Sequence, residues 1–174
     1  PEVDKSADFS HVGGCRVVRS KLGYRLISSG DKKRAGLAVM KLAKPLSGRV
    51  TFRTRMMVPG QSGFLVNGFV AFGDGPSDER LVKCGIRFRT GKATIIQGAI
   101  KASTRSTAAD VDAAVGKPVD LAVRVDLDRQ TVTLAAGATT VEAQLAEPLK
   151  QITHVGFCTD QAVADFSDLR VAGD

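Results

Sequence analysis

The sequence predicts an all-β fold, an antiparallel two-sheet β-sandwich that forms one domain over residues 1–174. Polar and apolar residues alternate along most of the chain, which is the period-two pattern of strands with one buried face. Turn residues interrupt this alternation at short intervals, as is typical of sandwiches and barrels. Helical periodicity is weak throughout, and 174 residues suit a single core.

Glycine, proline and aspartate mark the expected turns. The alternation is clearest at 48–58 and 81–89, and 88–93 and 125–132 look like tight hairpins. The one helical candidate is 107–115, where small residues after a Ser or Thr cap could form one or two turns or a loop crossing. We expect strands near 14–19, 23–28, 35–42, 48–58, 63–72, 81–89, 92–99, 118–126, 130–135, 139–145, 153–159 and 162–172.

Three of these strands carry cations on the face opposite their apolar residues. If 48–58, 81–89 and 118–126 lie in one sheet, their cations stand about 5 Å apart across strands and about 7 Å apart along each strand. The cations concerned are Arg49, Arg53, Arg55, Lys83, Arg87, Arg89 and Arg124.

The basic residues admit two interpretations. The chain has a net charge of +7, and its cations concentrate in 16–55 and 80–105, which favours an acidic partner. Alternatively, Asp120, Asp126 and Glu142 interleave with the cations and form an ion-pair lattice on a solvated face. Both interpretations stay open at this stage.

Three segments resemble the concanavalin A-like lectin/glucanase superfamily, which includes laminin-G-like jelly-roll domains. The segment 47–58 is similar to the early long strand of that superfamily, 118–134 to its late hairpin, and 162–171 to its closing strand. The resemblance implies a jelly-roll sandwich and a carbohydrate ligand. The chain departs from many carbohydrate-binding members because it has no Trp and only one Tyr, so a site built on aromatic platforms is disfavoured.

The leading hypothesis is a non-catalytic carbohydrate-binding module. It would hold a polysaccharide, an acidic one if the acids leave the arginines unneutralised, on the basic sheet face and on edge loops. Asn67 and the loop at 72–79 are the expected edge contacts. We expect a secreted bacterial domain excised from a longer protein, with neighbouring domains as further partners.

Two alternatives belong to other functional classes. A polysaccharide lyase could use Tyr24 or His11 as its base beside the arginines, whereas the paired carboxylates of a glycoside hydrolase are not recognisable in the sequence. A structural or adhesive sandwich would instead pack on a neighbouring domain and leave an apolar patch when isolated.

The resemblance also implies one cofactor, a structural Ca²⁺ held near the chain ends. Asp8, Asp165 and Asp168 are the candidate ligands, because the first and last strands of such sandwiches are usually neighbours.

Several other functions lack a signal. Zinc-ligand spacing and phosphate-binding glycine loops are absent from the sequence, as is any apolar run long enough for a membrane helix. Nucleic acid is disfavoured because no aromatic residues interleave with the basic strands. The three cysteines do not suggest a disulfide framework.

Overall fold

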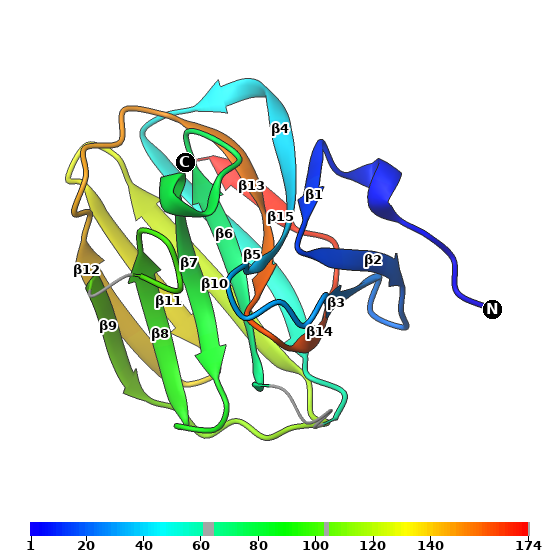
Figure 1. Cartoon of the computed structure of the whole chain (residues 1–174). Coiled ribbons are helices and arrows are strands. Elements are labelled where there is room, and N and C mark those ends of the chain that lie inside the picture. Colours follow the sequence, from blue (N-terminus) through cyan, green and yellow to red (C-terminus); the bar gives the residue numbers. More distant parts are fainter. Residues whose placement is uncertain (61–64, 103–104, 174) are drawn as a thin grey trace.

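A computed structural model describes residues 1–60, 65–102 and 105–173 of the chain. Two antiparallel sheets pack face to face, so the predicted two-sheet β-sandwich is confirmed (Figure 1). Two single-turn 3₁₀ helices, η1 (Ser6–Asp8) and η2 (Asp78–Arg80), lie outside the sheets. No helix in the described residues is long and apolar enough to cross a membrane.

The eight-stranded sheet, called sheet A, runs in the order β12-β11-β10-β5-β14-β3-β2, and β15 also pairs with β5. Its strands are β2 (Cys15–Arg19), β3 (Tyr24–Ser28), β5 (Arg49–Met57), β10 (Val119–Asp126), β11 (Thr131–Ala136), β12 (Thr139–Gln144), β14 (Val163–Phe166) and β15 (Arg170–Gly173).

The seven-stranded sheet, called sheet B, runs in the order β1-β4-β13-β6-β7-β8-β9. Its strands are β1 (His11–Gly13), β4 (Gly36–Leu46), β6 (Asn67–Gly73), β7 (Leu81–Arg87), β8 (Lys92–Gln97), β9 (Arg105–Asp110) and β13 (Ile152–Thr159).

The main core fills the space between the sheets. Phe52 of β5 and Phe72 of β6 stack across it with ring centroids 5.8 Å apart, and neither side chain is exposed. Each fully buried side chain of this size stabilises the fold by about 1.5–3 kcal/mol relative to exposure. The alternation seen in the sequence therefore places one side of each sheet in this core.

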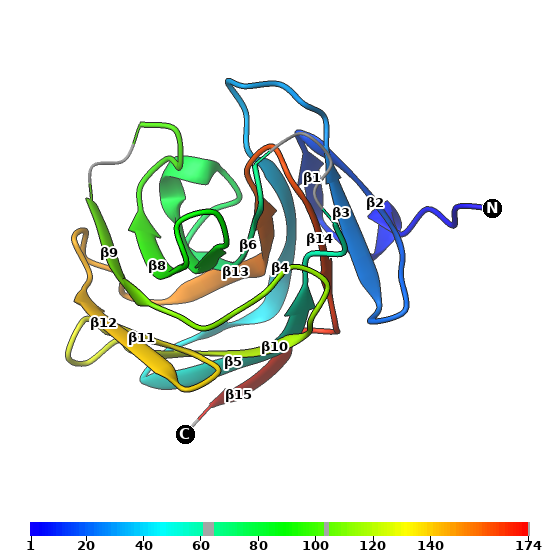
Figure 2. The same ribbon diagram turned by 90° about the horizontal axis from the view of Figure 1, so that it is seen from below.

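Sheet B curves tightly, and two glycines allow it to do so. A Cβ on Gly85 would lie 1.9 Å from the carbonyl oxygen of Gly68, and a Cβ on Gly156 would lie 2.0 Å from that of Ala38. No side chain fits between backbones that approach so closely. The outer side of the sheet thus becomes a hollow that the loops occupy (Figure 2).

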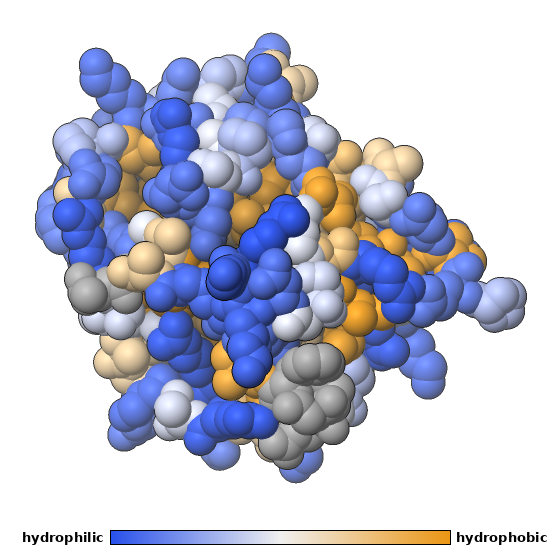
Figure 3. All heavy atoms as spheres, in the orientation of Figure 1, coloured by the Kyte–Doolittle hydropathy of each residue, from blue (hydrophilic) through white to orange (hydrophobic). Residues whose placement is uncertain are grey.

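A second, smaller apolar core lies in this hollow. Phe69 and Ile96 project from the outer side of sheet B and cluster with Ala35 and Ile100, which belong to covering loops. All four side chains are buried. The surface on this side of the molecule is mostly hydrophilic, with a few apolar residues between (Figure 3). Both faces of sheet B are therefore largely shielded from water, whereas sheet A keeps a free outer face.

Three expectations about the elements need correction. Residues 107–110 belong to strand β9, because this edge segment pairs with β8 in register rather than coiling. The expected strand at 162–172 is divided into β14 and β15. The strands at 48–58 and 118–126 share sheet A, but the strand at 81–89 lies in sheet B. Residues 63 and 64 of the expected strand 63–72 lie outside the described residues.

Candidate functional site

Strand β5 presents three arginines on the outer side of sheet A. Arg49, Arg53 and Arg55 are exposed, whereas Val50 and Phe52 between them are buried in the main core. This arrangement confirms the alternation expected from the sequence. Every second side chain of β5 is therefore available to a ligand that lies along the sheet.

The neighbouring strands add two more arginines to this surface. Arg124 of β10 lies directly opposite Thr51 of β5, and Arg170 of β15 lies directly opposite Arg53. Both arginines are exposed. We call this surface the arginine face; it consists of Arg49, Arg53, Arg55, Arg124 and Arg170.

Two members of the arginine face are paired with carboxylates. The guanidinium Nε of Arg55 donates to Asp120 Oδ1 at 2.9 Å, and Arg49 Nε lies 3.5 Å from Asp126 Oδ2. The hydrogen bond from Arg55 lowers the pKa of Asp120. The interleaving of acids that the sequence allowed is thus realised at these two positions.

The other three arginines have no such partner. Within the described ranges, no carboxylate lies within 4.0 Å of Arg53, Arg124 or Arg170, and Glu142 makes no ion pair. Arg53 and Arg170 are also direct cross-strand neighbours. Like charges opposite one another destabilise a sheet. Asp120 lines the same area and, among the described residues, is the one carboxylate there beside Arg53, Arg55 and Arg170, so positive charge is in excess in this part of the face.

Small side chains between the arginines leave two hollows on the face. A hollow of about 570 Å³ lies beside Arg53 and Arg170, with Ala122 and Ala135 among its lining residues. Another of about 510 Å³ lies beside Arg124. The guanidinium groups therefore border shallow depressions that a chain-like ligand can enter.

Lys83 lies on the opposite sheet and is fully buried. Its ammonium donates to the carbonyl oxygens of Asp78, Leu81 and Gly98 at 2.6–2.7 Å, and it lies 2.7 Å from Asp78 Oδ1. This side chain ties the covering loops to sheet B. It cannot contact a ligand on the arginine face.

The other expected contacts from sheet B are also separate from the arginine face. Arg87 is half-buried on the covered side of the sheet, and Arg89 lies in the β7–β8 turn. Asn67 is buried, with its side chain donating to Asp160 O at 2.9 Å and accepting from Asp160 N at 2.8 Å. Its amide group stabilises the fold.

The residues expected for a lyase do not come together. Tyr24 packs in an edge-to-face contact with Phe9, 5.0 Å between centroids, and its hydroxyl donates to Asp8 at 2.9 Å. Burial and this carboxylate raise the pKa of Tyr24, so its hydroxyl holds its proton more firmly and is less available to accept one from a substrate. His11 lies on sheet B beside His154. Neither residue faces the arginine face.

Two of the three candidate calcium ligands are engaged by other side chains, whereas Asp168 is exposed after β14, and Ca²⁺ binding stays a prediction. Asp165 is buried and receives two hydrogen bonds from Arg25, at 2.7 and 2.9 Å. Asp8 Oδ2 accepts from Tyr24 and lies 3.1 Å from Lys5. In the described part of the chain, no three His, Cys, Asp or Glu side chains are grouped closely enough to hold a metal.

Sequence reasoning missed Arg170. The expected closing strand already contained the signal, because Arg170 alternates there with Val171. Only the register shows that it lies opposite Arg53. Chain order does not reveal that β15 returns to the strand that carries three of the arginines.

Solved structures share this fold. The carbohydrate binding module CBM66 from Bacillus subtilis superposes with a TM-score of 0.74 at 11% identity, covering 94% of each chain. Chicken galectin 2 gives a TM-score of 0.60 at 13% identity over 77% of this chain and 97% of that chain. A sialidase gives a TM-score of 0.67 at 10% identity over 99% of this chain and 18% of that chain.

The expected concanavalin A-like jelly roll is thus confirmed as a fold. At these identities the likeness shows the fold alone. No family model and no curated protein matches the sequence.

Proposed function

We propose that this protein is a non-catalytic carbohydrate-binding module that holds an acidic polysaccharide on the arginine face. The observation that carries the proposal is the opposition of Arg53 and Arg170, with Arg124 nearby and no carboxylate within 4.0 Å of any of them in the described residues. The structural likeness to a carbohydrate binding module and to galectins supports a saccharide as the ligand.

The chemistry of the face favours anionic groups. A guanidinium matches a carboxylate or sulfate with two parallel hydrogen bonds, which a neutral hydroxyl cannot reproduce. An anion between Arg53 and Arg170 would also relieve their mutual repulsion. Among the described residues the face offers no aromatic ring, since the chain has no Trp, its one Tyr packs against the core, and Phe52 and Phe166 of sheet A are buried. Charge and hydrogen bonding therefore carry the recognition.

The location of acidic polysaccharides indicates where the module would act. Acidic polysaccharides are matrix or cell-surface polymers, so the module would act outside the cell. It would bring neighbouring domains of a longer protein to the polymer. An open sheet face also suits a polysaccharide ligand, because the polymer can extend past the binding site in both directions.

The test measures binding of heparin, polygalacturonate and neutral dextran at low and near-physiological salt. The triple variant Arg53→Gln, Arg124→Gln, Arg170→Gln removes the unpaired charges and keeps the side chains polar. Each exposed ion pair contributes up to about 1 kcal/mol, so we expect up to about a 100-fold loss of affinity for the acidic polymers. Raising the salt shortens the Debye length from about 30 Å at 0.01 M to about 8 Å at 0.15 M, which should weaken binding further.

The matched control is the triple variant Lys21→Gln, Lys32→Gln, Lys44→Gln. It removes the same charge from exposed lysines outside the arginine face, so most of the affinity should remain. Equal losses in the two variants would mean that only net charge matters and would refute the proposal. Tighter binding to dextran, or to double-stranded DNA included as a further probe, would refute it as well.

A further inference from the structure

A cavity of about 440 Å³ opens at one edge of the sandwich, away from the arginine face. It lies between the segments 73–82 and 145–149, with residues 97–98 and 105 completing its wall. We call it the edge pocket. Its volume falls within the range of roughly 300–1,000 Å³ that is usual for small-molecule sites.

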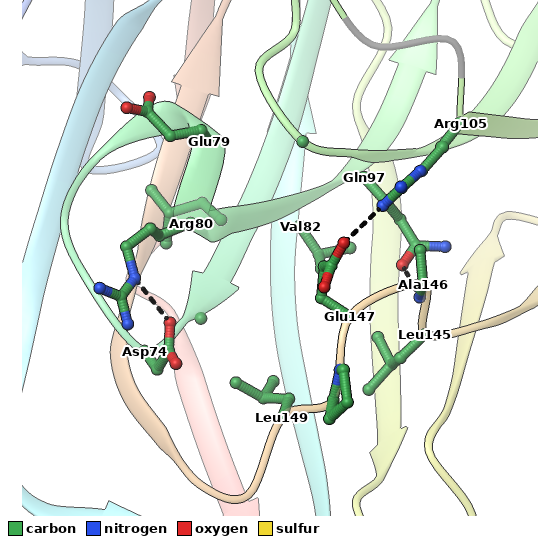
Figure 4. Close-up of a pocket in the computed structure, with 14 residues that line it drawn as sticks. Asp74, Glu79, Arg80, Val82, Gln97, Arg105, Leu145, Ala146, Glu147 and Leu149 are labelled. Atoms are coloured by element: carbon green, nitrogen blue, oxygen red, sulfur yellow. Dashed lines mark hydrogen bonds and ion pairs between the residues drawn. The ribbon is translucent and has the colours of Figure 1, made fainter.

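Two guanidinium–carboxylate pairs face one another across this pocket. Arg80 Nε donates to Asp74 Oδ1 at 3.0 Å on one side, and the Nη1 of Arg105 donates to Glu147 Oε1 at 2.9 Å on the other (Figure 4). In the part of the chain that the structure describes, the second carboxylate oxygen of Asp74 and of Glu147 accepts no hydrogen bond. Each pair thus holds a carboxylate in a fixed position with acceptor capacity to spare.

Gln97 fixes the wall that carries Glu147. Its side-chain amide donates to Gln144 O at 2.8 Å and its Oε1 accepts from Ala146 N at 2.7 Å. These bonds join β8 of sheet B to the segment after β12 of sheet A. The wall is therefore preorganised before any ligand arrives, which lowers the entropic cost of binding.

Apolar side chains lie between the two ion pairs. Val82 and Leu149 occupy the space that separates Asp74 from Glu147 in the pocket (Figure 4). An apolar floor bordered by a few placed polar groups is the usual composition of a ligand site. A sugar ring combines these features, since its C–H faces are apolar and its hydroxyl groups lie around the rim.

The charge of the pocket disfavours the ligand class proposed for the arginine face. Three carboxylates line it, from Asp74, Glu79 and Glu147, against the two guanidiniums of Arg80 and Arg105. The sum is −1, so a polyanion is disfavoured. A pair of neighbouring hydroxyls can donate to a carboxylate and accept from a guanidinium at the same time.

We propose that the edge pocket is a second binding site and that its ligand is a neutral saccharide. This site does not depend on the arginine face. The two surfaces would recognise different chemistry, charged groups along a polymer on sheet A and a neutral sugar unit at the edge.

The test is an NMR titration of the whole protein with glucose, galactose, fructose, maltose, lactose, sucrose and the cationic sugar glucosamine. We expect at least one neutral sugar to shift the backbone amides of Gly98 and Ala146 and the side-chain amide of Gln97. The shifts should persist at high salt and in the triple arginine variant. Polyanion binding can fail while these shifts remain, so the two proposals are separable.

The variants Asp74→Asn and Glu147→Gln test the polar wall. Both carboxylates are partly or largely exposed, with 40% and 79% of the side chain accessible, so the fold should tolerate their loss. Each change weakens a charge-assisted hydrogen bond, and we expect affinity to fall about tenfold. The control Asp112→Asn neutralises an exposed carboxylate beyond the far end of β9 and should leave the affinity unchanged.

Three outcomes would overturn the proposal. One is that no neutral sugar shifts these signals. Another is that glucosamine alone shifts them, which would point to a site for cations. The third is that Asp74→Asn and Glu147→Gln bind the sugar as tightly as Asp112→Asn, because the ion pairs would then not contact the ligand.

Discussion

The substitution Lys83→Met should destabilise the protein strongly although it replaces one lysine with an apolar residue of similar length. The Lys83 ammonium is fully buried. It donates hydrogen bonds to three carbonyl oxygens and lies 2.7 Å from Asp78 Oδ1. The variant leaves those carbonyls and Oδ1 of Asp78 without their donor, while Asp78 Oδ2 still accepts from Ile100 N. Removing one partner of a buried ion pair costs about 3–5 kcal/mol.

Urea unfolding measures this loss. With a slope of about 2 kcal/mol per molar for a domain of this size, a loss of about 4 kcal/mol lowers the urea midpoint by about 2 M. The control is Lys92→Met in the next strand, where the lysine is partly exposed and paired with Asp110. An exposed pair contributes at most about 1 kcal/mol, so the midpoint should fall by less than about 0.5 M.

The comparison of the two urea midpoints tests whether the Lys83 ammonium holds the covering loops to sheet B. If Lys83→Met and Lys92→Met unfold at the same urea concentration, the ammonium does not hold the covering loops to sheet B. If Lys83→Met does not fold at all, Asp78→Asn provides the second measurement. That variant removes only the counter-charge and should lie between the wild type and Lys83→Met.

Three further predictions concern the fold. Gly85→Ala should destabilise by at least about 1–3 kcal/mol in the same urea assay, because its Cβ would meet a neighbouring backbone at 1.9 Å; wild-type stability would contradict the close approach. Burial, and to a lesser extent nearby positive charge, lowers the pKa of His154 from 6.5, so its contribution to stability is complete above about pH 6.5 and is lost as the pH falls. In the variant His154→Gln, the thermal midpoint should depend less on pH below about pH 6.5 than it does in the wild type. An unchanged pH dependence would refute the role given to His154. Cys84 and Cys158 are free and fully buried, and burial raises the pKa of Cys15 to about 11; a thiol reagent at neutral pH should therefore label all three rapidly only in urea, and rapid labelling of the folded protein would exclude this packing.

The strands were predictable because alternation is a local property. Arg49, Arg53 and Arg55 occupy one side of β5 and Val50 and Phe52 the other, as the sequence indicated. Partner choice between strands is not local, since it depends on which apolar faces meet in the core. For this reason alternation alone could not decide whether the strand at 81–89 shares a sheet with 48–58, and the two lie in different sheets.

Lys83 shows why the site was harder to predict than the strands. The alternation on β7 predicts that Lys83 points away from the main core, and it does. The outer side of sheet B is nevertheless buried, because loops cover it. The sequence did carry one sign of this. The run Phe69, Val70, Ala71 and Phe72 is apolar at consecutive positions, which is typical of a strand buried on both faces.

Most of the edge pocket could not be derived from the sequence. Asp74, Gln97, Arg105 and Glu147 come from separate segments, and no spacing links them. The loop at 72–79 was an expected edge contact, and it does supply Asp74 and Glu79. The remaining wall depends on how the segment after β12 crosses to β8.

The second apolar core has a consequence for where substitutions can be made without loss of stability. Adjacent residues of β6 enter different compartments, Phe69 the smaller one and Val70 the main one. A substitution almost anywhere in the middle of sheet B therefore disturbs dry packing on one side or the other. Substitutions that leave the dry packing intact are therefore confined to the free face of sheet A and to the rim, because the loops that cover sheet B give it a second buried side.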